Sequence, residues 1–275
     1  VLVDLPKNVL QTSTEFVWPE DVSLRSYNPT YRPNYAQIRK VVDALYKAER
    51  PLLFGGGGVI MSNASEEFRN LANNLHIPVT CSLMGLGAFP CDHPQWLGML
   101  GMHGTYAANK AVSNADLLIA VGVRFDDRVT GRLSSFAPKA TIVHIDIDRA
   151  EIDKNVLTDH HIIGSARRVL SMLNERLPQY HHEAWKQHIL PMRAPSTAGD
   201  SAQLTPQQIL DVIQYQTPPE TIVATDVGQN QMWAIKYLHF RYPGQLLTSG
   251  GFGTMGFGLG AAIGAQLGNP DKRVI

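Results

Sequence analysis

The sequence has few cysteines, no excess of charge and no long apolar run. Cys81 and Cys91 are its only cysteines, too few for a disulfide framework, so it predicts a protein of the reducing cytoplasm. Its 24 basic side chains are matched by 24 acidic ones, which gives no electrostatic reason to bind nucleic acid or an anionic membrane. The longest apolar stretch, residues 117–121, is far shorter than a membrane span. Disordered, fibrous, membrane-spanning and secreted proteins are therefore disfavoured.

Both ends of the sequence fall inside expected strands. Residues 1–6 alternate like a strand that ends at proline, and residues 272–275 resemble the first residues of another strand. A natural terminus rarely lies within an element that should be buried. We therefore expect the chain to be an internal piece of a longer protein, and to make no product by itself.

Short apolar strands alternate with helical segments through most of the chain. Continuous apolar strands separated by helices predict a parallel sheet covered on both faces. Residues 34–177 therefore form one predicted doubly wound α/β domain, preceded at 1–33 by the end of another domain and a connector without periodicity. The expected strands are 51–54, 77–80, 115–121, 140–145 and 161–163, and the expected helices are about 34–46, 62–75, 105–113, 149–156 and 166–177.

The composition changes after this domain. Residues 178–203 are rich in small polar residues and proline, which predicts a linker. A second α/β unit, residues 204–275, begins at Thr205, a helix cap that is followed by Pro206 at the first helical position. Its expected elements are helix 206–216, strand 221–225, helix 229–239, strand 245–248, a glycine-rich turn and a helix to about 267.

Four glycines at 55–58 follow the first apolar strand and precede a helix. Parallel sheets bind ligands at the carboxyl ends of their strands, and glycine lets backbone N–H groups approach an anion such as a pyrophosphate. We therefore favour a ligand-binding turn over a merely tight one. A dinucleotide fingerprint is disfavoured, because Ile60 stands where its third glycine should be. The formal match at 251–256 lacks the expected acid after the next strand.

Charged residues follow two further strands. The loop 124–128 (Arg-Phe-Asp-Asp-Arg) either binds phosphates or an acidic substrate, or pairs with itself at the surface. Asp146, at the end of strand 140–145, either accepts ribose hydroxyls or is simply solvated. The histidine and cysteine spacings do not fit a zinc site, and no nucleophile elbow is present. The sequence thus assigns neither a metal ligand nor a Ser or Cys nucleophile.

Five segments taken together resemble one protein family. They are Val1–Lys7, Cys81–Pro90, Met99–Thr105, Gly122–Arg128 and Thr248–Gly258. In this order, and over nearly the whole chain, they resemble the catalytic subunit of acetohydroxyacid synthase (acetolactate synthase), a thiamine-diphosphate enzyme. The motifs S-L-M-G-L-G-A-F-P, M-L-G-M-H-G-T and G-V-R-F-D-D-R in one chain are highly specific.

The resemblance implies a fold and a first cofactor. The fold would be the doubly wound middle FAD-binding domain of that family plus the start of its pyrophosphate-binding domain. The flavin would be a structural cofactor without a redox role in the main reaction. The residues implied to surround it are Gly56, Gly57, Gly58, Ser82, Leu83, Met84, Met102, His103, Gly122, Arg124, Arg128, Val129, Asp146 and Ile147.

The second unit would hold thiamine diphosphate. By resemblance, Val227, Gly228 and Gln229 would meet its diphosphate, whereas Gly253 and Met255 would meet its aminopyrimidine. Met255 would be the catalytic residue of this chain, because a large side chain beneath the cofactor enforces its reactive bent shape. The activating glutamate and the Mg²⁺ site would lie outside the chain.

Two cations would lie at the substrate entrance, and two positions depart from the family. Lys7 and Arg128 resemble entrance residues that attract a ketoacid carboxylate. Asn230 stands where the family often has histidine, and Ser165 stands where many members have aspartate near the flavin's adenosine. We expect a modest effect of the first departure and, from the second, either weaker FAD binding or replacement of the carboxylate by water.

The implied activity is decarboxylation of pyruvate and transfer of the two-carbon unit to pyruvate or 2-ketobutyrate, the first common step of branched-chain amino acid synthesis. The enzyme would be a homodimer or larger, with a small regulatory subunit. The alternatives are a non-catalytic FAD- or nucleotide-binding module, pyruvate oxidase and glyoxylate carboligase. Residues 227–231 and 249–256 argue against the module, and segments 99–105 and 122–128 argue against the two enzymes.

Overall fold

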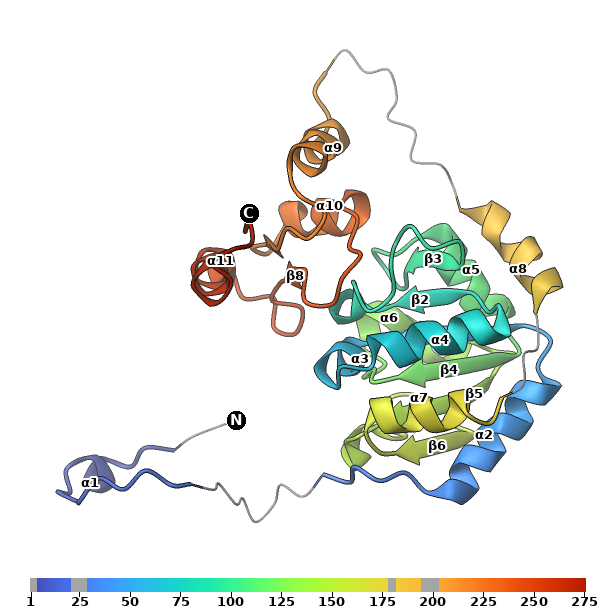
Figure 1. Ribbon diagram of the computed structural model, residues 1–275, viewed down its shortest axis with the longest axis horizontal. Coiled ribbons are helices and arrows are strands. Elements are labelled where there is room, and N and C mark those ends of the chain that lie inside the picture. The colour runs from blue at the N-terminus through green and yellow to red at the C-terminus, as the bar shows by residue number, and fades with distance from the viewer. Residues whose placement is uncertain (1–3, 21–28, 178–181, 194–202) are drawn as a thin grey trace.

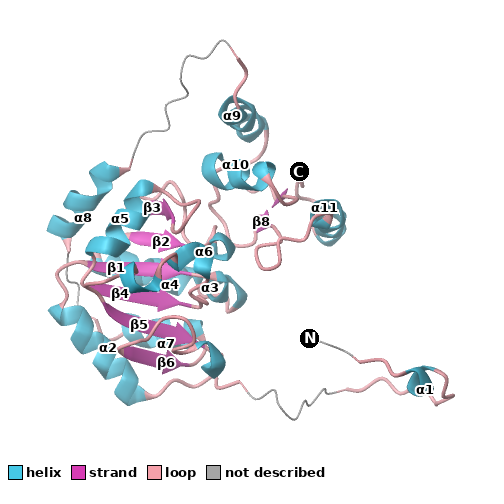
Figure 2. Ribbon diagram, turned by 180° about the vertical axis from the view of Figure 1, so that it is seen from behind, coloured by secondary structure: helices cyan, strands magenta, loops and turns pink. Residues whose placement is uncertain are grey.

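The computed structural model describes residues 4–20, 29–177, 182–193 and 203–275, which form two α/β units of unequal size (Figure 1). Residues 1–3 of the strand expected at the N-terminus lie outside the described residues. The connector that follows contains one helical turn, α1 (Lys7–Leu10), which the sequence does not predict. Every residue of α1 is exposed, and both ribbon views show it away from the sheet (Figures 1 and 2).

The larger unit is built on a six-stranded parallel sheet with the strand order β3-β2-β1-β4-β5-β6. The order reverses between β1 and β4, as in a doubly wound sheet. The predicted fold class is therefore confirmed. The strands are β1 (Pro51–Gly55), β2 (Val79–Cys81), β3 (Trp96–Met99), β4 (Leu117–Val121), β5 (Thr141–Asp146) and β6 (His160–Ile163).

Helices cover both faces of this sheet (Figure 2). Successive strand residues point to opposite faces, so Leu53 and Ile119 pack with α2, α4 and α7, whereas Leu52 and Leu118 pack with α5 and α8. Because both faces are buried, the central strands are apolar throughout. The helices are α2 (Tyr35–Lys47), α3 (Gly57–Met61), α4 (Ser65–Leu75), α5 (Tyr106–Asn114), α6 (Asp127–Thr130), α7 (Ala166–Asn174) and α8 (Glu183–Ile189).

Two elements of this unit differ from the sequence-based expectation. Strand β3 is not predicted, because Gly98, at φ 98°, interrupts its short apolar run. The helix expected over 149–156 is only a 3₁₀ turn at Arg149–Glu151. Asp153 ends it, since this residue has a left-handed φ of 59° and its carboxylate accepts hydrogen bonds from the N–H and hydroxyl of Thr158, both at 2.8 Å.

The segment 178–203, predicted to be a linker, contains helix α8. Trp185 and Ile189 of α8 are buried in the core on the α5 face of the sheet. The Trp185 indole N–H donates a hydrogen bond to the carbonyl of Pro51, at 3.0 Å, which anchors α8 at the start of β1. The predicted linker thus contains a helix that packs on the core, which its lack of periodicity does not indicate. Residues 178–181 and 194–202 of the predicted linker lie outside the described residues.

The smaller unit follows the predicted order of elements. Thr205 and Gln208 form a capping box at the start of its first helix. A parallel bridge between Ile222 and Val274 supports the strand expected to begin at 272–275. The elements are α9 (Pro206–Gln216), β7 (Val223–Ala224), α10 (Gln229–Tyr237), β8 (Leu246–Leu247) and α11 (Phe257–Gly268), with β7 and β8 paired in parallel.

The smaller unit packs on the loops that follow β2. The Arg241 guanidinium lies 2.7 Å from the Asp92 carboxylate, and the Cys91 N–H donates a hydrogen bond to the carbonyl of Phe240, at 3.2 Å. Gly250 packs against the sulfur of Met84, leaving no room there for a side chain. The loops that carry the two sets of predicted cofactor residues are thereby brought into contact.

We predict that Trp185→Ala lowers the free energy of unfolding of the larger unit by about 3–5 kcal/mol, because it removes a buried indole and its hydrogen bond. Urea unfolding measures the change. The control is Trp18→Ala, since the Trp18 side chain is 78% exposed and its loss should cost less than about 0.5 kcal/mol. Equal effects of the two substitutions would show that α8 is not part of the core.

Candidate functional site

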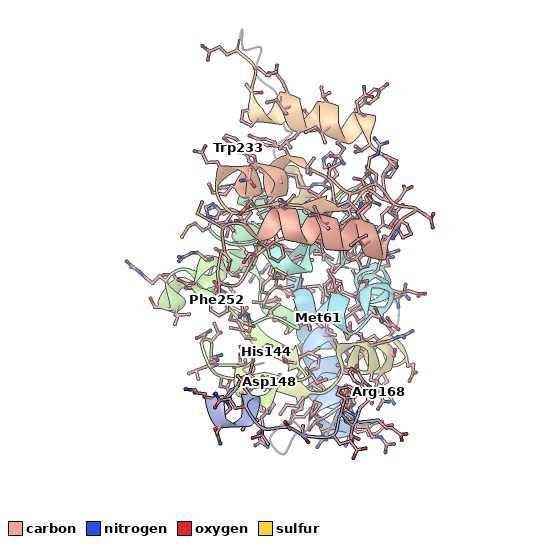
Figure 3. The ribbon with its side chains drawn as sticks, turned by 90° about the vertical axis from the view of Figure 1, so that its left-hand side faces the viewer. Met61, His144, Asp148, Arg168, Trp233 and Phe252 are labelled. Atoms are coloured by element: carbon pink, nitrogen blue, oxygen red, sulfur yellow. The ribbon has the colours of Figure 1, made fainter. Side chains whose placement is uncertain are left out.

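The residues expected to surround a flavin all lie at the carboxyl ends of the strands. Gly56–Gly58 follow β1, Ser82–Met84 follow β2, Met102–His103 follow β3, Gly122–Val129 follow β4, and Asp146–Ile147 end β5. They share one edge of the sheet, the edge viewed in Figure 3 with His144 and Asp148 labelled. The loops after β1 and β4 flank the switch point, where open α/β sheets bind their ligands.

The glycines after β1 serve close contact between two loops. The N–H groups of Gly56 and Gly58 donate hydrogen bonds to the carbonyls of Val121 and Gly122, at 2.9 and 3.1 Å. A Cβ atom at Gly56 would overlap the Gly122 carbonyl oxygen, and one at Gly58 would lie 2.6 Å from the Gly122 Cα. Two of the N–H groups that we expected to face an anion are therefore used inside the protein. Glycine is needed at these positions mainly because the backbones of the two loops pack directly against each other.

Further backbone contacts join the remaining loops. The Ser82 N–H donates a hydrogen bond to the Gly55 carbonyl at 2.9 Å, and the Met102 N–H donates one to the Arg128 carbonyl at 2.8 Å. A Cβ at Gly57 would lie 3.1 Å from the Cβ of Met84. The structure thus brings the predicted flavin residues of β1 to β4 together as one connected rim.

Three large apolar side chains are exposed along this rim. Met84, Met102 and Ile147 are 45%, 65% and 38% exposed, and they come from the ends of β2, β3 and β5. Exposed apolar groups that surround a ligand-binding edge are typical of a site for a flat, partly apolar molecule.

The loop after β4 is partly paired with itself. The Asp126 carboxylate caps α6 by accepting a hydrogen bond from the Arg128 N–H at 3.0 Å, and this bond lowers the pKa of Asp126. The Arg128 guanidinium lies 2.8 Å from Asp127, and that of Arg124 lies 3.7 Å from Asp126. Both arginines are well exposed, and exposed ion pairs are weak. Turning either guanidinium toward a ligand phosphate therefore costs little.

The Asp146 carboxylate lies 3.8 Å from Nε2 of a buried histidine, His144. The His144 ring is fully buried, and its Nε2–H donates a hydrogen bond to the Val123 carbonyl at 2.8 Å. Burial lowers the pKa of His144, so the ring is neutral near pH 7. Its Nδ1 has no hydrogen-bond partner among the described residues. Burial raises the pKa of Asp146, whose carboxylate accepts a hydrogen bond from the Asp148 N–H at 2.8 Å.

The residues expected to bind thiamine diphosphate lie together in the smaller unit. Val227–Gln229 follow β7 and lead into α10, whereas Gly253 and Met255 lie on the loop between β8 and α11. A Cβ at Gly253 would lie 3.8 Å from Cγ1 of Val227, so the two loops are neighbours. Gly228 has a φ of 125°, which only glycine adopts readily, and it begins α10 without a side-chain cap. The Met255 side chain is 79% exposed.

Other predicted residues lie elsewhere. Lys7, predicted at the substrate entrance, is on the exposed helix α1, which Figure 1 shows apart from α6, the helix that carries Arg128. Asn230 lines a cavity of about 510 Å³ between α9, β7, α10 and α11, most of whose lining is apolar. Ser165 occupies the N-cap position of α7, and its side chain makes no capping hydrogen bond.

Sequence reasoning did not select Asp226. Its carboxylate accepts hydrogen bonds from the N–H groups of Val227, at 2.7 Å, and Gly256, at 2.9 Å, and so joins the two loops of the smaller unit. The available signal was its position, an acid directly after a short apolar strand and before Val227-Gly228. That pattern does not show that the partner N–H lies thirty residues further along the chain.

Two family models match the chain. The central domain of thiamine pyrophosphate enzymes matches residues 38–173, and their C-terminal TPP binding domain matches residues 226–275. The two matches cover more than half of the chain, and they coincide with the six-stranded sheet and with the loops of the smaller unit. The chain belongs to the thiamine pyrophosphate enzymes.

Within this family, the chain is similar to acetolactate synthase large subunits. It is 44% identical over 287 residues to the isozyme 3 large subunit of Escherichia coli, and 43% identical to the large subunits of Haemophilus influenzae and Corynebacterium glutamicum. Each alignment covers the whole chain but only 50%, 50% and 45% of the relative. The chain thus spans about half the length of the curated relatives it matches. The resemblance inferred from the motifs is confirmed.

The described residues contain neither a membrane-spanning helix nor a metal-binding cluster. No helix in the described part of the chain is long and apolar enough to cross a membrane. Among the same residues, no three His, Cys, Asp or Glu side chains lie together as a group that could hold a metal ion.

We predict that Gly56→Ala destabilises the larger unit by about 1–3 kcal/mol, because the added methyl group forces apart the loops after β1 and β4. The midpoint of urea unfolding measures the loss. The control is Gly260→Ala on α11, where a Cβ would meet no atom within 4 Å and alanine favours the helix. A Gly56→Ala protein as stable as the wild type would contradict the packing argument.

Proposed function

We propose that the protein containing this chain is an acetolactate synthase, which decarboxylates pyruvate and transfers the two-carbon unit to pyruvate or 2-ketobutyrate. The similarity to acetolactate synthase large subunits along the entire chain carries this proposal. The contact between the β2 loop of the larger unit and the β8 loop of the smaller unit supports it, since both sets of predicted cofactor residues then face one region. This reaction would belong to branched-chain amino acid synthesis in the cytoplasm.

Thiamine diphosphate fits the two loops of the smaller unit. When bound, it supplies the electron sink that lets a 2-ketoacid lose carbon dioxide. Gly228 leaves the N-terminus of α10 without a side-chain cap, so Gly228 and Gln229 can offer N–H groups to the diphosphate. Val227 would lie beside the diphosphate, with its own N–H donated to the Asp226 carboxylate. Gly253 and Met255 would hold the aminopyrimidine, with the exposed Met255 side chain packed beneath it. Mg²⁺ would bind the diphosphate through ligands that the described residues do not supply.

FAD fits the carboxyl edge of the six-stranded sheet as a structural cofactor. The exposed apolar side chains of Met84, Met102 and Ile147 would contact its rings. The exposed guanidiniums of Arg124 and Arg128 would face its phosphates, and Arg128 would also border the substrate entrance. The carboxylate of Asp146 would accept a ribose hydroxyl.

Exposed apolar side chains beside the predicted thiamine diphosphate site suit assembly with a second chain. Met255 and its neighbour Phe252 are large, apolar and exposed, which is typical of residues that another protein surface covers. A second copy of the protein would supply it in a homodimer or larger assembly. The relatives are named large subunits, which supports a separate small regulatory subunit.

We predict that the protein containing this chain converts pyruvate to 2-acetolactate when supplied with thiamine diphosphate, Mg²⁺ and FAD. Adding 2-ketobutyrate should yield 2-aceto-2-hydroxybutyrate as well. In Met255→Ala, kcat should fall about 10- to 100-fold, because the cofactor loses the group that holds its reactive shape. Met61→Ala, another exposed methionine, is the control. Oxygen-dependent formation of acetyl phosphate, or no carboligation at all, would overturn the proposal.

We predict that the protein retains FAD, visible by flavin absorbance, and that Arg124→Ala weakens FAD binding about tenfold by removing a charge-assisted contact to phosphate. The control is Arg132→Ala, which removes another exposed arginine. The FAD affinity of this variant should equal that of the wild type. Unchanged affinity in Arg124→Ala would remove this residue from the flavin site. Equal losses in both variants would point to a general charge effect.

A further inference from the structure

Asp226 connects the two loops of the smaller unit. Its Oδ1 accepts hydrogen bonds from the N–H groups of Val227 and Gly256, at 2.7 and 2.9 Å, and its Oδ2 lies 3.0 Å from the same Gly256 nitrogen. Val227 begins the loop that leads into α10, and Gly256 begins α11. Asp226 thus bonds to a residue thirty positions further along the chain.

The same carboxylate caps helix α11. Gly256, the residue at the N-cap position of α11, has no side chain and adopts a left-handed φ of 90°. The Asp226 carboxylate accepts the hydrogen bond of the Gly256 N–H from another element, and its negative charge faces the positive end of the helix dipole. Gly258 permits the approach, since a Cβ there would lie 2.8 Å from the Asp226 nitrogen. The N-terminus of α11 is therefore occupied, and that of α10 is left for a ligand.

A second set of contacts fixes the main chain on either side of Asp226. The hydroxyls of Thr225 and Thr248 lie 2.7 Å apart at the ends of β7 and β8, and both residues are buried. The Gln231 amide, on the first turn of α10, donates a hydrogen bond to the Thr248 hydroxyl at 2.7 Å. The loops consequently leave the strand pair from defined positions, and Asp226 sets their spacing beyond it.

We propose that Asp226 is a positioning residue that holds the Val227–Gln229 and Gly253–Met255 loops at the spacing needed to bind thiamine diphosphate. The inference rests on the proposed function. It assigns no contact between Asp226 and the cofactor, because both carboxylate oxygens are engaged by backbone N–H groups. The first loop would grip the diphosphate and the second the aminopyrimidine, so a change in their spacing moves the two ends of one ligand apart.

The ionised form of the Asp226 carboxylate is the one that can accept the hydrogen bonds of both loops. The N–H of Val227 and then that of Gly256 lower the pKa of Asp226 below its usual range, so the group is charged near neutral pH. An asparagine has the same shape but replaces one acceptor oxygen by an NH₂ donor. That donor would face the Gly256 N–H, and the bridge would lose an acceptor and its charge.

The test is made in the full protein containing this chain, and compares Asp226→Asn with wild type and with Asp211→Asn, a change of an exposed aspartate on α9. Hydrogen exchange of peptides covering 225–229 and 253–258 is measured without thiamine diphosphate. Thiamine diphosphate is then titrated in the presence of Mg²⁺, with the fluorescence of Trp233, a partly exposed residue of α10, as the signal. Flavin absorbance reports whether the larger unit is intact.

We expect faster exchange in both peptides of Asp226→Asn, a Kd for thiamine diphosphate raised about tenfold or more, and unchanged FAD binding. Asp211→Asn should match the wild type in all three. Faster exchange with a thiamine diphosphate Kd that stays within about twofold of the wild type would overturn the positioning role alone. If the wild type itself does not bind thiamine diphosphate, the proposed function fails, whatever the exchange data show.

A second variant covers the case in which Asp226→Asn does not fold. Asp226→Glu keeps the charge near α11 but displaces the carboxylate by one methylene group. It should raise the Kd for thiamine diphosphate by less than Asp226→Asn does, because one of the two loop contacts can still form. Wild-type affinity in Asp226→Glu would show that the charge alone suffices and that the bridge does not set the spacing.

Discussion

The close approach of two backbone turns at the centre of the sheet is the constraint on which the site depends. Gly56 and Gly58 after β1 lie directly against Gly122 after β4, and their N–H groups bond to carbonyls across the gap. Any side chain at these positions would separate the strands at the switch point. The rest of the rim follows, because the loops after β2 and β3 are bonded in turn to these two. The predicted flavin residues therefore form one surface.

In the smaller unit, side chains rather than backbone contacts position the loops that carry the predicted cofactor residues. Its strands β7 and β8 are too short to define the loops that follow them, so side chains do this instead. The Thr225–Thr248 contact fixes where the loops begin, and the Asp226 carboxylate fixes how far apart they run. Met84 and Gly250 then bring this unit against the larger one. The loops that carry the two sets of predicted cofactor residues are thus joined through contacts of a few residues.

Elements with strong hydrophobic periodicity or clear helix caps lie where the sequence predicts them, whereas elements with weak periodicity differ from the prediction. Apolar strands such as β4 and helices such as α9, with its proline and capping box, lie where the pattern predicts them. Strand β3 was missed because Gly98 breaks its pattern, and the helix expected after Arg149 was prevented by the left-handed Asp153. Helix α8 was hidden among polar residues, since only Trp185 and Ile189 tie it to the core. In each case a tertiary contact or a single dihedral angle outweighed the local pattern.

By itself, the sequence determined the fold class, most of the central strands and helices and the membership of the family, because each depends on local periodicity or on motifs read along the chain. Only the tertiary structure decided what the glycines after β1 do and that Asp226 spans two loops. These outcomes depend on which backbone atoms meet across the sheet or between units, and no spacing along one chain specifies such distances.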